Sequence, residues 1–136
     1  MLDLDADIIP GVGAAGITIG QSIAAVLALG LVAGMKSGPV SAQADRYGMG
    51  IIDGIWVTQG YRGKVAGKIG IGSRIADVIA AFGPVQYIAF GEYQLDKGTP
   101  WLENDWLFSV ERGSPVDGEP GWEDASICCI AIGSAD

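Results

Sequence analysis

The sequence predicts an α+β fold, in which an antiparallel sheet carries two short helices on one face. The first observation is that stretches of strand character outnumber helical stretches and are joined by short, glycine-rich loops. The second is an internal repeat, because residues 16–30 and 68–82 share seven identities in fifteen aligned positions. We therefore expect one domain over residues 1–136, built from two related αβ units at about 8–66 and 67–136.

The second copy of the repeat, at residues 68–84, is the best-defined element. Its pattern predicts a short strand, a tight glycine turn and an amphipathic helix. Ser73 is the expected N-cap, and Gly83 followed by Pro84 predicts the end of the helix. One apolar helical face is expected from the residues spaced at i, i+3, i+4 and i+7, namely Ile75, Val78, Ile79 and Phe82.

The first copy lies in an uncharged stretch, residues 8–35, where we expect a buried core helix at about residues 21–33. A transmembrane helix is disfavoured because Gln21 and Ser22 interrupt the run and leave only 13 nearly all apolar residues after them. A signal peptide is disfavoured because the residues before the stretch are acidic rather than basic.

Two short motifs near the N-terminus predict no ligand. Residues 1–7 alternate between apolar and aspartate residues, which predicts a half-buried strand or an extended arm. The D-x-D-x-D spacing is not a calcium loop, because Ile8 stands where that loop requires glycine. Residues 11–16 match G-x-G-x-x-G, but the dinucleotide motif requires a helix next, and residues 17–19 favour a strand. No metal and no nucleotide are expected.

Further strands are expected where β-branched and aromatic residues cluster or alternate. Asp53 and Gly54 predict either a hairpin turn or a bulge between two β-rich runs. The last strand, residues 125–132, is apolar throughout and is expected at the centre of the sheet. The other strands are expected at residues 51–52, 55–57, 85–90 and 105–111, and loops at 34–46, 95–103 and 112–123.

The composition argues against an enzyme. The chain has no histidine, which removes the commonest general base and the commonest metal ligand. No lysine lies in an S-x-x-K motif. Cys128 and Cys129 are adjacent, so on a regular strand they point to opposite faces, and we expect two buried free thiols in a reducing compartment. We predict no catalytic residue and no cofactor.

The charge is strongly negative and unevenly distributed. The net charge is −8, and residues 46–74 hold five basic residues against Asp53 alone. Residues 75–136 hold eleven acidic residues against Lys97 and Arg112. An acidic half repels nucleic acid and anionic membranes and favours a basic partner. The alternative is that the acidity serves only solubility.

Aromatic residues gather beside these acids. Three of the four tryptophans lie within residues 101–122. Tryptophan and tyrosine anchor protein interfaces, and acids around them speed the encounter with a basic partner. The alternative is that Trp106 is a core residue and that Trp101 and Trp122 only cover sheet edges. The expected partner-binding residues are Glu92, Tyr93, Asp96, Trp101, Glu103, Asp105, Trp122, Glu123 and Asp124.

The order of the motifs resembles small bacterial immunity proteins, which are encoded beside polymorphic toxins, including effectors of type VI secretion. The matching segments are an acidic N-terminus, P-G-V-G before G-I-x-I-G, then D-G-I-W-V, Y-R-G-K-V and I-G-I-G-S-x-I-x-D-V-x-x-x-F-G-P. The tandem αβ repeat is also similar to β-lactamase-inhibitor-like and outer-membrane assembly lipoprotein folds, although the lipobox cysteine of the latter is missing. The resemblance implies a cytoplasmic, non-enzymatic protein that binds one toxin and occludes its active-site cleft, which we expect to be basic.

Two other functions remain open at this point. One is an envelope or structural module that binds a partner strand at a sheet edge. The other is a small hydrolase that uses paired carboxylates such as Glu103 and Asp105.

Overall fold

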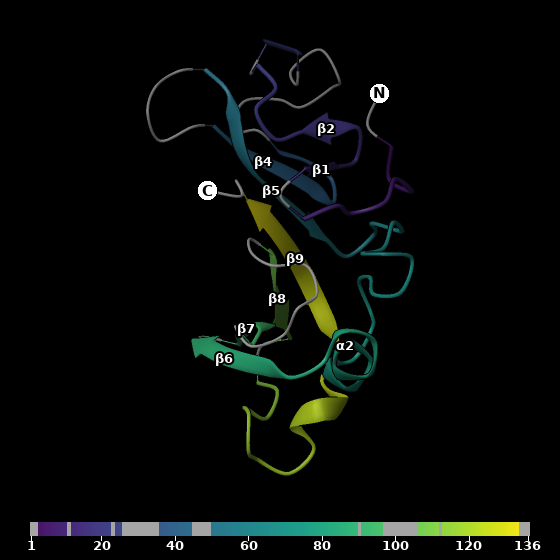
Figure 1. The fold of residues 1–136 in the computed structure, drawn as a ribbon, viewed down its shortest axis with the longest axis vertical. Coiled ribbons are helices and arrows are strands. Elements are labelled where there is room, and N and C mark those ends of the chain that lie inside the picture. Colours follow the sequence, from purple (N-terminus) through teal and green to yellow (C-terminus); the bar gives the residue numbers. More distant parts are fainter. Residues whose placement is uncertain are drawn as a thin grey trace.

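The computed structural model describes residues 3–10, 12–22, 24–25, 36–44, 50–89, 91–96, 106–111 and 113–133. These residues form mainly antiparallel sheet (Figure 1). A small two-stranded sheet pairs β1 (Gly13–Ala14) with β2 (Ile17–Thr18). A seven-stranded sheet has the order β3-β4-β5-β9-β8-β7-β6. Its strands are β3 (Lys36–Ser37), β4 (Val40–Ala44), β5 (Ile52–Thr58), β6 (Val85–Ala89), β7 (Glu92–Leu95), β8 (Trp106–Val110) and β9 (Ile127–Gly133).

The helical part of the described chain is small. It comprises α2 (Ile75–Phe82), a short 3₁₀ helix, η1 (Trp122–Asp124), and two helical residues of the first copy, Ala24 and Ala25. The α+β class is confirmed in its sheet-dominated form, but two short helices on one face are not found among the described residues. The predicted helix at residues 21–33 lies mostly outside them. Ala24 and Ala25 are helical there, and the Ala25 N–H donates to Ser22 Oγ over 3.2 Å.

Helix α2 begins one residue later than its sequence signal. Arg74, not the predicted Ser73, occupies the N-cap, and the Asp77 carboxylate accepts the Arg74 N–H over 2.9 Å. That hydrogen bond holds the pKa of Asp77 below its ordinary value. Ser73 instead accepts the Gly70 N–H over 3.1 Å and closes the preceding turn. The predicted end is confirmed, because Gly83 takes a φ of 105° and donates to the Ile79 carbonyl.

Several strands differ from the prediction. Strand β5 is continuous, so of the two alternatives predicted for Asp53 and Gly54 the hairpin turn is wrong and the bulge is confirmed, with Asp53 as the extra residue opposite β4. Strand β7 lies at residues where no strand was expected, because Gly91 turns the chain from β6 into β7. Strands β3 and β4 occupy much of the predicted loop at residues 34–46. The central position of β9 is confirmed, since it lies between β5 and β8.

The two copies of the repeat make the same contacts with the centre of the sheet. In the first copy, Gly20 donates to the Ile52 carbonyl over 2.7 Å, and Ile52 donates back to Gln21 over 2.9 Å. In the second copy, the residues 52 positions later do the same with β9: Gly72 donates to Ile127 over 2.9 Å, and Ile127 donates to Ser73 over 2.7 Å. Both glycines have a positive φ, 93° and 95°, which disfavours any other residue. Each copy is therefore joined to one of the two central strands, β5 or β9, by the same pair of backbone hydrogen bonds.

The core lies on one face of the large sheet. Strands β5 and β9 meet at the centre, with Ile55 opposite Ile132 and Val57 opposite Ile130. All four side chains are buried. Helix α2 packs on this face through its predicted apolar residues Ile75, Val78 and Phe82, and the Phe82 ring contacts Trp106. Figure 1 shows β9 running between an upper half with β1 to β5 and a lower half with α2, β6 to β8 and η1.

Candidate functional site

The predicted partner-binding residues fall in three places. Glu92 and Tyr93 lie on β7, and Asp96 follows its end. Trp122, Glu123 and Asp124 form η1. Trp101, Glu103 and Asp105, the centre of the predicted site, lie outside the described residues. The structure brings β7 and η1 together, because the rings of Tyr93 and Trp122 stack with centroids 6.0 Å apart and planes 16° apart.

Tyr93 is a core residue, with a side chain that is 0% exposed. Its ring stacks on Phe108 at 5.7 Å and 10°, and meets Tyr87 edge to face at 5.2 Å. The prediction that Tyr93 contacts a partner directly does not fit this position. Trp122 is half-buried and covers Tyr93 from the side of η1. The stack of these two aromatic residues therefore packs η1 against the sheet.

Trp106 continues the same aromatic layer. It is 4% exposed and contacts Phe82 at 5.7 Å and Phe108 at 5.9 Å. This is the core position that the alternative interpretation of the tryptophans predicted. The layer Phe82–Trp106–Phe108–Tyr93–Trp122 thus connects α2 to η1 across β8 and β7.

A group of exposed carboxylates lies next to this aromatic layer, in residues 113–124, which we call the acidic loop. Asp117, Glu119, Glu123 and Asp124 are all exposed, and residues 113–133 contain no lysine or arginine. The loop is built from tight turns; Glu119 accepts the Val116 N–H through its carboxylate over 2.7 Å and donates its own N–H to the Val116 carbonyl. Figure 1 shows this loop, which ends in η1, at one end of the molecule. Asp117 and Glu119 were not predicted as site residues, although the charge asymmetry of the sequence pointed to this half.

Arg74, the N-cap residue of α2, reaches the acidic loop. The Arg74 guanidinium lies 3.6 Å from Asp124 and 3.5 Å from Asp77. Each of the three side chains is at least 44% exposed to solvent, so these ion pairs contribute little to stability. Arg74 leaves most of the negative charge of the loop available to a partner.

The Tyr93 hydroxyl lies beneath the acidic loop. Burial raises the pKa of Tyr93, and the nearby carboxylates of Asp117 and Glu119 raise it further, while the Asp117 backbone opposes them. The hydroxyl is therefore protonated at neutral pH. Within the described residues, the geometry completes no hydrogen bond to Tyr93 Oη or to Trp106 Nε1.

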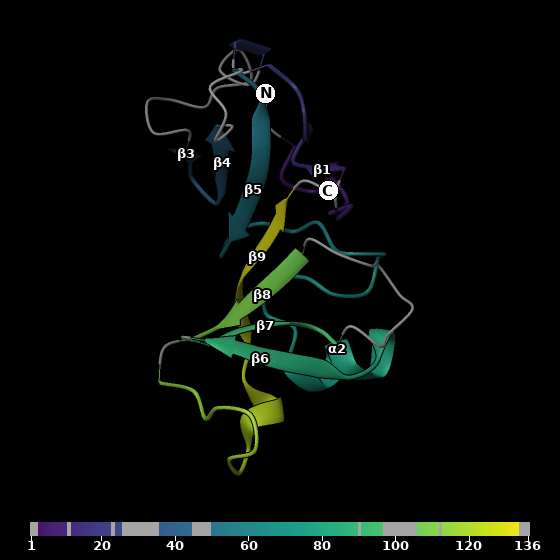
Figure 2. The same ribbon diagram turned by 60° about the vertical axis from the view of Figure 1, so that its left-hand side comes forward.

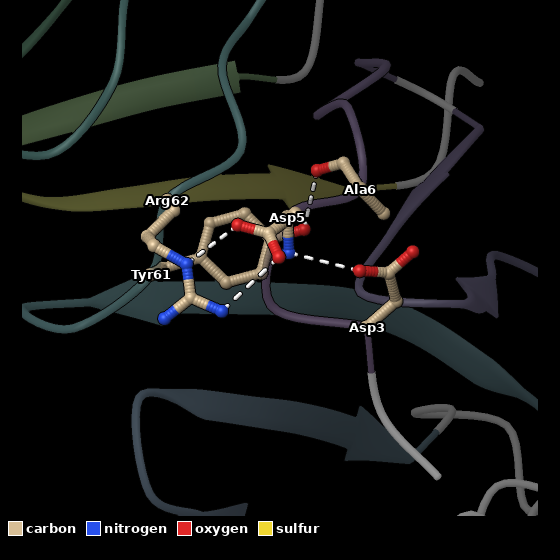
Figure 3. A network of polar contacts seen from close by, with 5 residues as sticks. All are labelled: Asp3, Asp5, Ala6, Tyr61 and Arg62. Atoms are coloured by element: carbon tan, nitrogen blue, oxygen red, sulfur yellow. Dashed lines mark hydrogen bonds and ion pairs between the residues drawn. The ribbon is translucent and has the colours of Figure 1, made fainter.

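A second acidic segment is the N-terminal strap, residues 3–9, which crosses the region around Tyr61 (Figure 3). The Tyr61 hydroxyl donates to the Ala6 carbonyl over 2.6 Å and accepts the buried Ala15 N–H over 2.8 Å. Arg62 pairs with Asp5 through Nε at 2.5 Å and Nη2 at 3.1 Å. This contact lowers the pKa of Asp5 and raises that of Arg62. The aspartates of the strap are exposed, but the strap itself is fastened to the fold.

We expect Tyr61→Phe to lower the free energy of unfolding by about 2 kcal/mol, because it leaves the Ala15 N–H and the Ala6 carbonyl without their partner. Tyr93→Phe is the matched control, since it removes a buried hydroxyl that completes no hydrogen bond among the described residues. Urea denaturation of both variants measures the difference. Equal effects of the two substitutions would contradict the role assigned to Tyr61.

Both cysteines are free, and both are partly exposed rather than buried as predicted. Ser109 pairs with Cys129 but Val110 pairs with Ile127, so Cys128 is the extra residue of a bulge and the expected alternation of faces breaks there. Burial, with help from Cys128 and Glu92, raises the pKa of Cys129 to about 11. Cys129 is therefore a thiol at neutral pH and a weak nucleophile.

Neither a metal site nor a membrane-spanning helix is found among the described residues. They contain no group of three or more metal-binding side chains. In the part of the chain that the structure describes, no helix is both long and apolar enough to cross a membrane.

The fold and this surface together define a sheet-dominated α+β domain with one exposed acidic end. No family model matches the chain, and no match was found among curated proteins or among solved structures.

Proposed function

We propose that this chain is a non-enzymatic immunity protein, which binds one toxin and occludes its active site. The observation that carries the proposal is the acidic loop, with its four exposed carboxylates and no base in residues 113–133. The resemblance of the motifs to toxin-neutralising immunity proteins points the same way.

The loop suits a cleft that evolved for an anionic substrate such as nucleic acid. Its carboxylates would take the place of phosphates and meet the basic residues of that cleft. The turn hydrogen bonds of Glu119 and the Trp122–Tyr93 stack hold the loop in one arrangement before binding. A preorganised loop loses less conformational entropy on association than a flexible one.

We place the protein in the cytoplasm, where such a toxin would act. Two free, adjacent cysteines are typical of a reducing compartment. The acidic surface disfavours nucleic acid and anionic membranes as direct partners. The absence of histidine from the sequence and the raised pKa of Cys129 support a binding role rather than catalysis.

The test is co-expression with the product of the neighbouring reading frame. We expect that product alone to arrest growth, and this chain to restore growth and to co-purify with it. If the product is harmless and does not bind this chain, the proposal is wrong.

The loop makes a specific kinetic prediction. Asp117→Asn combined with Glu123→Gln should slow association with the toxin by about tenfold at low salt and much less at high salt, because exposed carboxylates act mainly by steering. Stopped-flow association at two salt concentrations measures this effect.

The control removes the same charge elsewhere. Asp3→Asn combined with Asp7→Asn changes two exposed carboxylates of the N-terminal strap, which lies in the upper half of Figure 1, whereas the acidic loop lies at the bottom. We expect this variant to associate at nearly the original rate. If both double variants slow association equally, net charge rather than the loop is responsible.

A further inference from the structure

Strand β6 is the last strand of the seven-stranded sheet, and β7 is its only strand neighbour among the described residues (Figure 2). The Asp96 N–H donates to the Pro84 carbonyl over 3.0 Å, and Gln86 lies opposite Gln94 two residues further along. In an antiparallel pair, hydrogen-bonded and non-bonded positions alternate. The N–H and C=O groups of Val85 and Tyr87 therefore point away from β7. Within the described part of the chain, no backbone hydrogen bond reaches these outward groups.

This edge lacks charge. Residues 83–91 contain no charged residue. Tyr87 is 38% exposed and Ile88 is 45% exposed, so two of the five exposed large apolar side chains of the described chain lie on this one strand. Sheet edges are usually protected by charges or bulges. Here a bulge at Ile88 is present, and it limits the straight free edge to residues 85–87.

The surroundings of the edge indicate its partner. From residue 83 to residue 96, the segment that contains β6 and β7, the chain carries Glu92 and Asp96 and no base. A second copy of this chain would bring the same negative charge, on a molecule of net charge −8. A basic segment would instead be attracted to the hairpin of β6 and β7.

We propose that the outer edge of β6 pairs with a short, extended, basic segment of the toxin. This inference rests on the proposed function, and it adds a second contact surface to the acidic loop. The segment would form backbone hydrogen bonds with Val85 and Tyr87 and place an apolar side chain against Tyr87 or Ile88. Backbone pairing would supply affinity, and the flanking charges would select a basic sequence.

The edge can be tested without the toxin. The full chain is titrated with a blocked pentapeptide of sequence Lys-Val-Thr-Val-Lys, and separately with Glu-Val-Thr-Val-Glu, at up to about 1 mM, where weak binding is detectable. We expect the basic peptide to slow hydrogen exchange at the amides of Val85 and Tyr87. The exchange rate of the Gln86 amide, which points toward β7, should not change. The acidic peptide should bind about tenfold more weakly. No change at Val85 and Tyr87, or equal binding of both peptides, overturns the proposal.

A pair of variants tests the charge preference at the same site. Ile88→Lys and Ile88→Glu remove the same apolar side chain from the same bulge and differ in the sign of the new charge. We expect the basic peptide to bind Ile88→Lys about tenfold more weakly than Ile88→Glu. The reverse order, or no difference, contradicts a basic occupant.

The outcomes separate this inference from the proposed function. If the toxin co-purifies but leaves the Val85 and Tyr87 amides unprotected, only the edge proposal fails. If the peptide binds at β6 but no toxin is neutralised, the edge accepts a basic strand and the immunity function fails. If the two amides become protected as the protein alone is concentrated, the occupant is a second copy and the proposal is wrong.

Discussion

Tyr93→Ala is expected to lower the free energy of unfolding by about 3–5 kcal/mol. The ring is fully buried and contacts three others, Tyr87, Phe108 and Trp122. Its removal leaves a cavity in the layer that holds η1 on the sheet. Urea denaturation followed by tryptophan fluorescence measures the loss.

The control for this prediction keeps the ring. Tyr93→Phe should change stability by less than about 1 kcal/mol, because the hydroxyl completes no hydrogen bond among the described residues. If Tyr93→Ala folds with nearly unchanged stability and loses only partner binding, Tyr93 is an interface residue and its placement in the core is wrong. The pair of variants thus separates packing from recognition at one position.

Gly63→Ala is expected to destabilise the fold by about 3 kcal/mol or to prevent the N-terminal strap from docking. A Cβ at this position would overlap the Ala6 carbonyl of the strap and lie 2.7 Å from the Tyr61 ring. The Ala6 carbonyl is also the acceptor of the Tyr61 hydroxyl, so the overlap and the hydrogen bond cannot both be accommodated. Thermal unfolding measures the loss of stability, and hydrogen exchange at Ile8, which donates to Lys64, measures the docking of the strap.

Gly72→Ala is the matched comparison. Gly72 has a φ of 95°, and a Cβ added there would meet no atom within 4 Å among the described residues, so an alanine suffers backbone strain without a clash. We expect a cost of about 1–2 kcal/mol and an unchanged strap. If Gly63→Ala costs less than Gly72→Ala, the close contact between the strap and residue 63 is not a determinant of stability.

The stability and the recognition surface of this protein are linked through the same aromatic layer. Trp122 belongs to η1 at the end of the acidic loop, and Tyr93 belongs to β7 beside the β6 edge. Both proposed contact surfaces are therefore built on one packed support. A variant that loosens this support should weaken binding at the loop and at the edge together, which is why each binding test above uses exposed residues.

The local pattern of the sequence was sufficient for α2, β9 and the sheet-dominated class. Apolar residues at helical spacing determine which side of α2 is buried. A continuous apolar run such as that of β9 is typical of a strand in the middle of a sheet, with a neighbouring strand on each edge. The repeat at an offset of 52 residues predicted two related αβ units, and the backbone hydrogen bonds of Gly20 and Gly72 are related by the same offset.

Other features depended on contacts between distant residues. Ser73 has the chemistry of an N-cap, but its hydroxyl accepts the Gly70 N–H and its carbonyl accepts the N–H of the distant Ile127, and the N-cap is Arg74. Strand β7 is short and has little periodicity, and it exists because it pairs with β6 and β8. Because Tyr93 is close to acidic residues in the sequence, it was predicted to be an interface residue. It is a core residue because Phe108 and Trp122, which come later in the chain, pack against its ring. Periodicity determines which side chains share a face, whereas the element that covers the face is determined by tertiary packing.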